Sequence, residues 1–109
     1  MPVHRYVAKR PPEQADLVKR LAKEWQSTNS TAEEPVILEE PNRQGQIEHV
    51  YVVWGDWAHL DRTLRGEIIM DAAEKVKPKA DVVKITIAMG LTPDEADRFG
   101  LKWRSKRTA

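Results

Sequence analysis

A run of β-branched and aromatic residues passes directly into a helical pattern near the middle of the chain, and this junction constrains the fold strongly. Residues 47–54 read IEHVYVVW, a composition typical of a strand. Both alternating sets of side chains become apolar towards Trp54, which predicts a strand covered on both faces at its carboxyl end. Gly55 ends the strand, and a helical pattern begins directly after it, so the chain must combine strand and helix.

The helical pattern covers about residues 57–76, with a start at either 57 or 61. Apolar residues recur along it every three or four positions, at Trp57, Leu60, Leu64, Ile68, Ala72 and Val76. Asp56 is predicted to cap this helix, and Asp61 could cap a second start if the first turn is separate. Trp54 and Trp57 are therefore interpreted as large core residues on either side of a strand–helix joint.

Four further elements are expected around this joint. An apolar stripe at helical spacing predicts a helix over about residues 12–27, and the run from Val36 to Leu38 predicts a strand. Residues 82–88 alternate in β-branched side chains and are expected to form a strand, with a short helix ending at Gly90 as the alternative. Residues 92–100 carry the T-x-x-E capping box and terminal glycine of a small helix.

The resulting order is helix–strand–strand–helix–strand–helix. It predicts an α+β fold class, in which a small mixed three-stranded sheet packs against helices. This order resembles that of BolA-like proteins and type II KH domains. The G-x-x-G loop with which KH domains hold RNA and the Arg-His-Arg signature expected in BolA are absent from the sequence. The resemblance is therefore one of element order and assigns no functional residue.

Length and composition fit one cysteine-free domain of 109 residues. The expected division is a basic N-terminal segment at 1–10, a single α+β domain at 11–101 and a basic C-terminal tail at 102–109. Without cysteine, disulfides, thiolate chemistry and cysteine-ligated metals are excluded, and the cytoplasm is the expected compartment. No apolar run approaches the ~20 residues of a membrane span, and the N-terminus does not read as a secretory signal.

Charge is concentrated at the two ends of the chain. Residues 1–10 and 101–109 contain seven basic residues and no acid, whereas the other 11 basic residues face all 17 acids, which leaves the body at about −6. The simpler interpretation is an acidic domain with frayed basic tails, and the alternative is that the tails contact phosphates or an acidic partner. The candidate nucleic-acid contacts are Lys102, Trp103, Arg104, Lys106 and Arg107. A helix-turn-helix at 82–99 is the other route, although acids at the start of its second helix oppose phosphate binding.

Histidine and aspartate gather at residues 49–61, where His49, Asp56, His59 and Asp61 have the chemistry for metal binding or acid–base catalysis. Their spacing fits no metal or catalytic motif, and no phosphate-binding glycine motif or nucleophile elbow is present. The cluster is therefore interpreted as helix caps and surface histidines. No cofactor is expected, and a small enzyme using this cluster is the weakest of the functional alternatives.

Met70 is the candidate partner contact. It lies opposite the apolar stripe of its helix, where an isolated exposed methionine is ordinary, and the alternative is a partner-facing residue, because methionine adapts to irregular surfaces. Gly66 in the same helix weakens it by up to ~1 kcal/mol relative to alanine, which suggests a close approach by another element. The favoured hypothesis is a non-enzymatic interaction module that binds a protein partner or self-associates as a homodimer. A nucleic-acid-binding protein is the first alternative.

Overall fold

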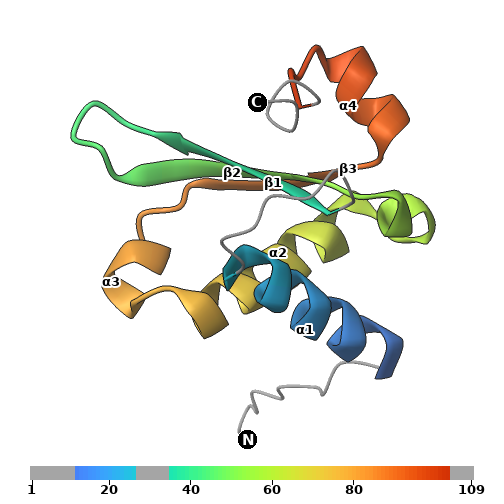
Figure 1. Cartoon of the computed structure of the whole chain (residues 1–109), viewed down its shortest axis with the longest axis horizontal. Coiled ribbons are helices and arrows are strands. Elements are labelled where there is room, and N and C mark those ends of the chain that lie inside the picture. Colours follow the sequence, from blue (N-terminus) through green and yellow to red (C-terminus); the bar gives the residue numbers. More distant parts are fainter. Residues whose placement is uncertain (1–11, 27–34, 104–109) are drawn as a thin grey trace, which may run out of the picture.

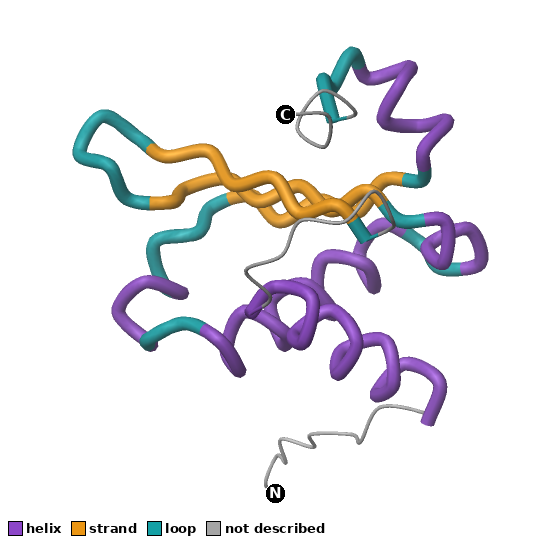
Figure 2. Tube along the Cα trace, viewed as in Figure 1, coloured by secondary structure: helices purple, strands orange, loops and turns teal. Residues whose placement is uncertain are grey.

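The computed structural model describes residues 12–26 and 35–103 (Figures 1 and 2). The elements in these ranges are α1 (Pro12–Gln26), β1 (Val36–Pro41), β2 (Ile47–Val53), the 3₁₀ helix η1 (Gly55–His59), α2 (Arg62–Val76), α3 (Lys79–Val82), β3 (Ile87–Leu91) and α4 (Pro93–Phe99). The predicted α+β fold with a small mixed sheet is confirmed. The structure adds η1 and α3 to the expected order.

The three strands form one sheet in the order β1-β2-β3. β1 and β2 are antiparallel and joined by a tight turn, where the Asn42 side chain accepts hydrogen bonds from the backbone of Gln44 and Gln46. β2 and β3 are parallel, so the chain must cross over between them, and α2 and α3 lie in that crossover. This crossover brings α2 against β3.

The helices divide between the two faces of the sheet (Figure 1). α1 and α2 cover one face and enclose the larger core, whose centre includes Leu21, Val50 and Ile68. α4 and the segment after it lie over the other face, where Val53, Leu91 and their neighbours form a smaller core. The carboxyl half of β2 is buried on both sides, as its sequence predicts.

The strand–helix joint is built on two buried tryptophans. The rings of Trp54 and Trp57 meet edge to face with centroids 5.1 Å apart, and the Trp57 indole Nε1 donates to the Val52 carbonyl over 3.0 Å. This confirms their interpretation as core residues. The prediction that Asp56 caps the helix is wrong, because the chain first makes η1, which contains Asp56. The cap of α2 is Asp61, whose side chain accepts from the backbone of Leu64.

A third strand forms as predicted, but the bounds predicted for it, residues 82–88, are wrong, as is the alternative of a helix ending at Gly90. Residues 79–82 form the short helix α3, and the strand runs from Ile87 to Leu91. Alternation of β-branched residues misled the prediction because Val82 faces the core from a helix, whereas Val83 is 70% exposed. Since a strand separates α3 from α4, no helix-turn-helix forms at 82–99.

α4 follows its sequence signals closely. Thr92 and Glu95 form the capping box, and Gly100 ends the helix in the left-handed conformation. Leu101 then leads the chain back to the sheet, where Trp103 is only 8% exposed and packs in the smaller core. The Trp103 indole Nε1 donates to Asp97 over 3.1 Å. The packed part of the chain therefore reaches beyond the domain limit expected at residue 101.

Candidate functional site

The structure does not assemble the histidine–aspartate cluster into one site. His49 lies 3.1 Å from the Glu40 carboxylate, Asp56 pairs with Arg20 over 3.0 Å, and Asp61 caps α2. His59 is exposed in the last turn of η1. No group of three histidine, cysteine or acidic side chains suited to a metal ion occurs among residues 12–26 and 35–103.

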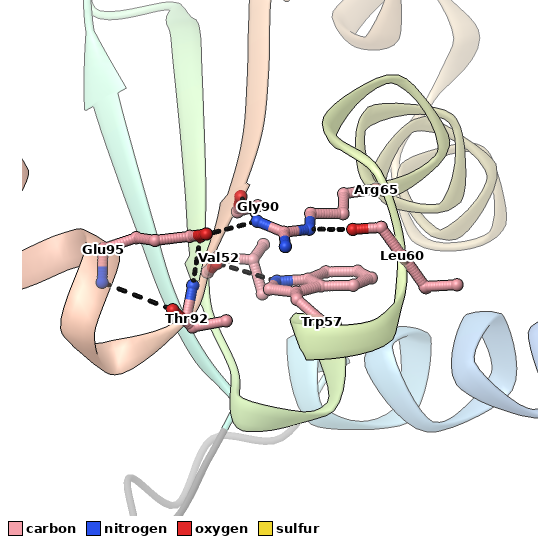
Figure 3. Close-up of polar contacts among 7 residues, drawn as sticks. All are labelled: Val52, Trp57, Leu60, Arg65, Gly90, Thr92 and Glu95. Carbon is pink, nitrogen blue, oxygen red and sulfur yellow. Dashed lines mark hydrogen bonds and ion pairs between the residues drawn. The ribbon is translucent and has the colours of Figure 1, made fainter.

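A buried arginine forms a polar network that the sequence analysis missed (Figure 3). Arg65 of α2 is 5% exposed. Its Nε donates to the Leu60 carbonyl over 2.9 Å, while its Nη1 donates to the Gly90 carbonyl over 3.0 Å and to Glu95 Oε1 over 2.6 Å. The only signal in the sequence was an arginine beside Leu64 and Ile68 on the apolar side of the helix.

Glu95 receives hydrogen bonds from two directions. Its carboxylate accepts from the Thr92 backbone N–H over 2.9 Å as well as from Arg65. The Thr92 hydrogen bond and, after it, the Arg65 guanidinium lower the pKa of Glu95, against the opposing effect of burial. The charges of Arg65 and Glu95 thus compensate each other within the protein. Their hydrogen bonds join α2, β3 and α4.

The better candidate for a functional surface lies beside Met70. An open hollow of about 370 Å³ is lined by Thr63, Gly66, Glu67, Met70 and Asp71 of α2 and by Ala88 of β3. A Cβ added to Gly66 would lie 3.1 Å from the Ala88 carbonyl oxygen, so glycine allows α2 to approach β3 closely. This confirms the close approach expected at Gly66. Met70 itself is partly exposed at the hollow.

Four residues of α2 at intervals of four form a row on the helix surface, and the middle two of them line this hollow. We call Arg62, Gly66, Met70 and Glu74 the α2 ridge, because residues spaced by four follow one row on a helix surface. Arg62 and Glu74 are exposed at its two ends. Glu74 also borders a second hollow together with Val82 and the exposed Val83. The α2 ridge therefore has a charged residue at each end, with Gly66 and the adaptable Met70 between them.

The five C-terminal residues predicted to contact nucleic acid lie partly inside and partly outside the described part of the chain. Lys102 is exposed, whereas Trp103 is buried and donates to Asp97. Its indole is therefore not presented to solvent for stacking on a base. Arg104, Lys106 and Arg107 lie outside the described residues.

The chain matches no known family model, no curated protein and no solved structure. Within residues 12–26 and 35–103, none of the helices has the length and apolar character needed to cross a bilayer.

Proposed function

We propose that this protein is a non-enzymatic, cytoplasmic interaction module that contacts a protein partner through the α2 ridge. The observation that carries the proposal is the position of Met70, partly exposed at an open hollow between α2 and β3. Methionine is unbranched and polarisable, so it adapts to the shape of a partner. The hollow beside it offers a partner side chain a place to pack.

The composition of the ridge suits protein recognition better than catalysis. Gly66 and Met70 supply the uncharged part of this surface, and charged side chains surround them, as at the core and rim of a protein interface. The charged residues are Arg62, Glu67, Asp71 and Glu74. The His49 and Asp56 side chains, by contrast, are paired separately with Glu40 and Arg20. The absence of cysteine from the sequence is the reason for the cytoplasmic assignment.

A site-specific photo-crosslinker placed at Met70 tests this proposal in the cells that make the protein. The matched control carries the same crosslinker at Lys23, an exposed position on α1. We expect a discrete protein adduct from position 70 and none from position 23, with the adduct identified by mass spectrometry. If position 70 gives no more adduct than position 23, the ridge is not a contact surface and the proposal fails.

Nucleic-acid binding by the basic C-terminal tail is a second candidate. The observation in its favour is that Lys102 is exposed next to the anchored Trp103, and that four basic residues without an acid end the sequence. Because the Trp103 ring is buried, such binding would depend on charge. Four phosphate contacts would give a log–log salt slope of roughly −3 to −4.

A fluorescence titration of oligonucleotides separates this candidate from the first. The full chain is compared at two salt concentrations with a form ending at Trp103, which keeps the packed indole. Binding that weakens steeply with salt and disappears in the shorter form supports the tail. Equal binding by both forms, or salt-resistant binding, contradicts it.

A further inference from the structure

We infer that the basic N-terminal segment, residues 1–10, folds back over the hollow beside Met70 and competes there with a protein partner. The segment lies outside the described residues, whereas the surface that would receive it lies within them. The inference rests on the proposed function in one respect, because it names a regulator of the same surface. Charge, position along the chain and apolar content all favour this occupant.

Two adjoining hollows on this side of the molecule carry an excess of carboxylates. Besides the hollow at Met70, an open hollow of about 660 Å³ lies between α1 and α2, and Asp71 lines both. The acidic side chains that line one or both hollows are Asp16, Glu67, Asp71 and Glu74. The basic side chains among the described residues that line them are Lys19 and Lys75. The four carboxylates therefore attract a cationic occupant.

The N-terminal segment has the complementary charge. It contains three basic residues and no acid, namely Arg5, Lys9 and Arg10. Tyr6 and Val7 stand between these bases and supply apolar side chains. Covering Met70 with such side chains removes apolar surface from water, while the bases on either side meet the acidic rim. The acidic partner that a basic end of the chain requires is thus present on the chain itself.

The segment also joins the fold next to these hollows. α1 begins at Pro12, and Ala15 and Asp16 near its start line the second hollow. An extended residue spans up to ~3.6 Å, so Arg10 lies within about 7 Å of Pro12. Since Asp71 borders both hollows, a segment that reaches Asp71 also reaches the surface at Met70.

The short connection makes even a weak contact effective. A tethered segment meets its site at an effective concentration on the order of 1 mM, which a separate partner must overcome. The apparent affinity of that partner is reduced by the fraction of chains in which the surface is open. Salt screens exposed charge pairs, so high ionic strength should release the segment.

Paramagnetic relaxation enhancement in the full-length protein tests the inference. The sequence contains no cysteine, so Ala8→Cys allows a single nitroxide label in the segment. We expect the amide signals of Met70 and Asp71 to broaden at low salt and to recover at high salt. The signal of Phe99 should stay sharp, because α4 lies on the other face of the sheet (Figure 1). Ser105→Cys, labelled in the basic C-terminal tail, is the matched control and should leave Met70 sharp.

Charge reversal then tests whether the two sets of charges meet. Lys9→Glu combined with Arg10→Glu should lower the broadening at Met70 roughly twofold or more, because like charges then face each other. Glu67→Lys combined with Asp71→Lys should do the same, and all four substitutions together should restore it. Lys106→Glu combined with Arg107→Glu makes the same change of charge in the other tail and should have no effect. Thermal melts verify that each variant is folded.

The inference is overturned if the label at position 8 leaves Met70 sharp at low salt, or if the label at position 105 broadens it equally. Broadening that survives either charge reversal, or that the four substitutions together fail to restore, also overturns it. The experiment contains no partner protein, so its outcome is separate from that of the crosslinking. If Met70 stays sharp but the crosslinker captures a partner, the proposed function stands and this inference fails. If Met70 broadens and no partner is captured, the segment is the occupant and the proposed function fails.

Discussion

The guanidinium of Arg65 and the carboxylate of Glu95 meet over 2.6 Å and join α2 to α4 at the end of β3 (Figure 3). The Arg65 side chain is 6% exposed and that of Glu95 is 22% exposed. A buried charge is stable only when a partner and hydrogen bonds compensate its lost hydration. Glu95 supplies the opposite charge, and the Leu60 and Gly90 carbonyls accept the other hydrogen bonds.

Replacing Glu95 with alanine should therefore destabilise the fold by about 3 kcal/mol, because it leaves the Arg65 charge buried without a counter-charge. It also removes the capping interaction with Thr92. Urea unfolding measures the change, with Asp94→Ala as the control, since Asp94 is exposed in the same first turn. If the two variants lose the same stability, the network does not hold α4 to α2.

The pH dependence of stability should carry the signature of the same residue. The pKa of Glu95 lies below its ordinary value of 4.5 in the folded chain. Its contribution to stability is thus fully present above the unfolded pKa and is lost as pH falls through the folded pKa. We expect the free energy of unfolding to decrease below about pH 4.5, and Glu95→Gln to show a shallower decrease in that range.

The comparison uses urea melts at several pH values between neutrality and the acid limit of folding. Asp94→Asn is the control for removing one carboxylate from the same turn. A parallel decline in the parent and Glu95→Gln would show that protonation of Glu95 does not account for the loss of stability in acid.

Features that depend on local spacing could be predicted from the sequence. The apolar stripe of α2, the capping box at Thr92 and Glu95 and the buried pair Trp54 and Trp57 all follow from periodicity or from short-range hydrogen bonding. The α+β class followed from their order. In the candidate surface, the oddity of Met70 and the close approach at Gly66 were visible because each departs from the pattern of its own helix.

Features that depend on contacts across the fold could not be predicted in this way. β3 pairs with β2 over Ile87–Leu91, and Gly90 within it packs against Trp57. Neither contact appears in the alternation of residues 82–88. Asp56 has the chemistry of a cap, but η1 places it beside Arg20. The role of Arg65 depends on Glu95, 30 residues away along the chain.

Gly90 is a direct test of that tertiary constraint. A Cβ at this position would lie 2.8 Å from the Trp57 indole and 2.9 Å from the Arg65 Cβ, closer than such atoms pack. Gly90→Ala should therefore cost about 1–3 kcal/mol through overpacking. Gly66→Ala is the comparison, because its nearest contact is 3.1 Å and alanine improves helix propensity. Chemical denaturation should show the larger loss at Gly90, and the reverse order would contradict this account of β3.

Trp103 should define how far the folded domain extends. Its indole is buried in the smaller core and donates to Asp97, so Trp103→Ala should destabilise the protein by about 3 kcal/mol, as for other large core truncations. A chain ending at Leu101 should lose a similar amount, whereas a chain ending at Trp103 should keep the stability of the parent. Denaturant unfolding of the three forms provides the measurement. If the form ending at Leu101 is as stable as the form ending at Trp103, the tryptophan is not part of the core, and the tail begins at residue 102.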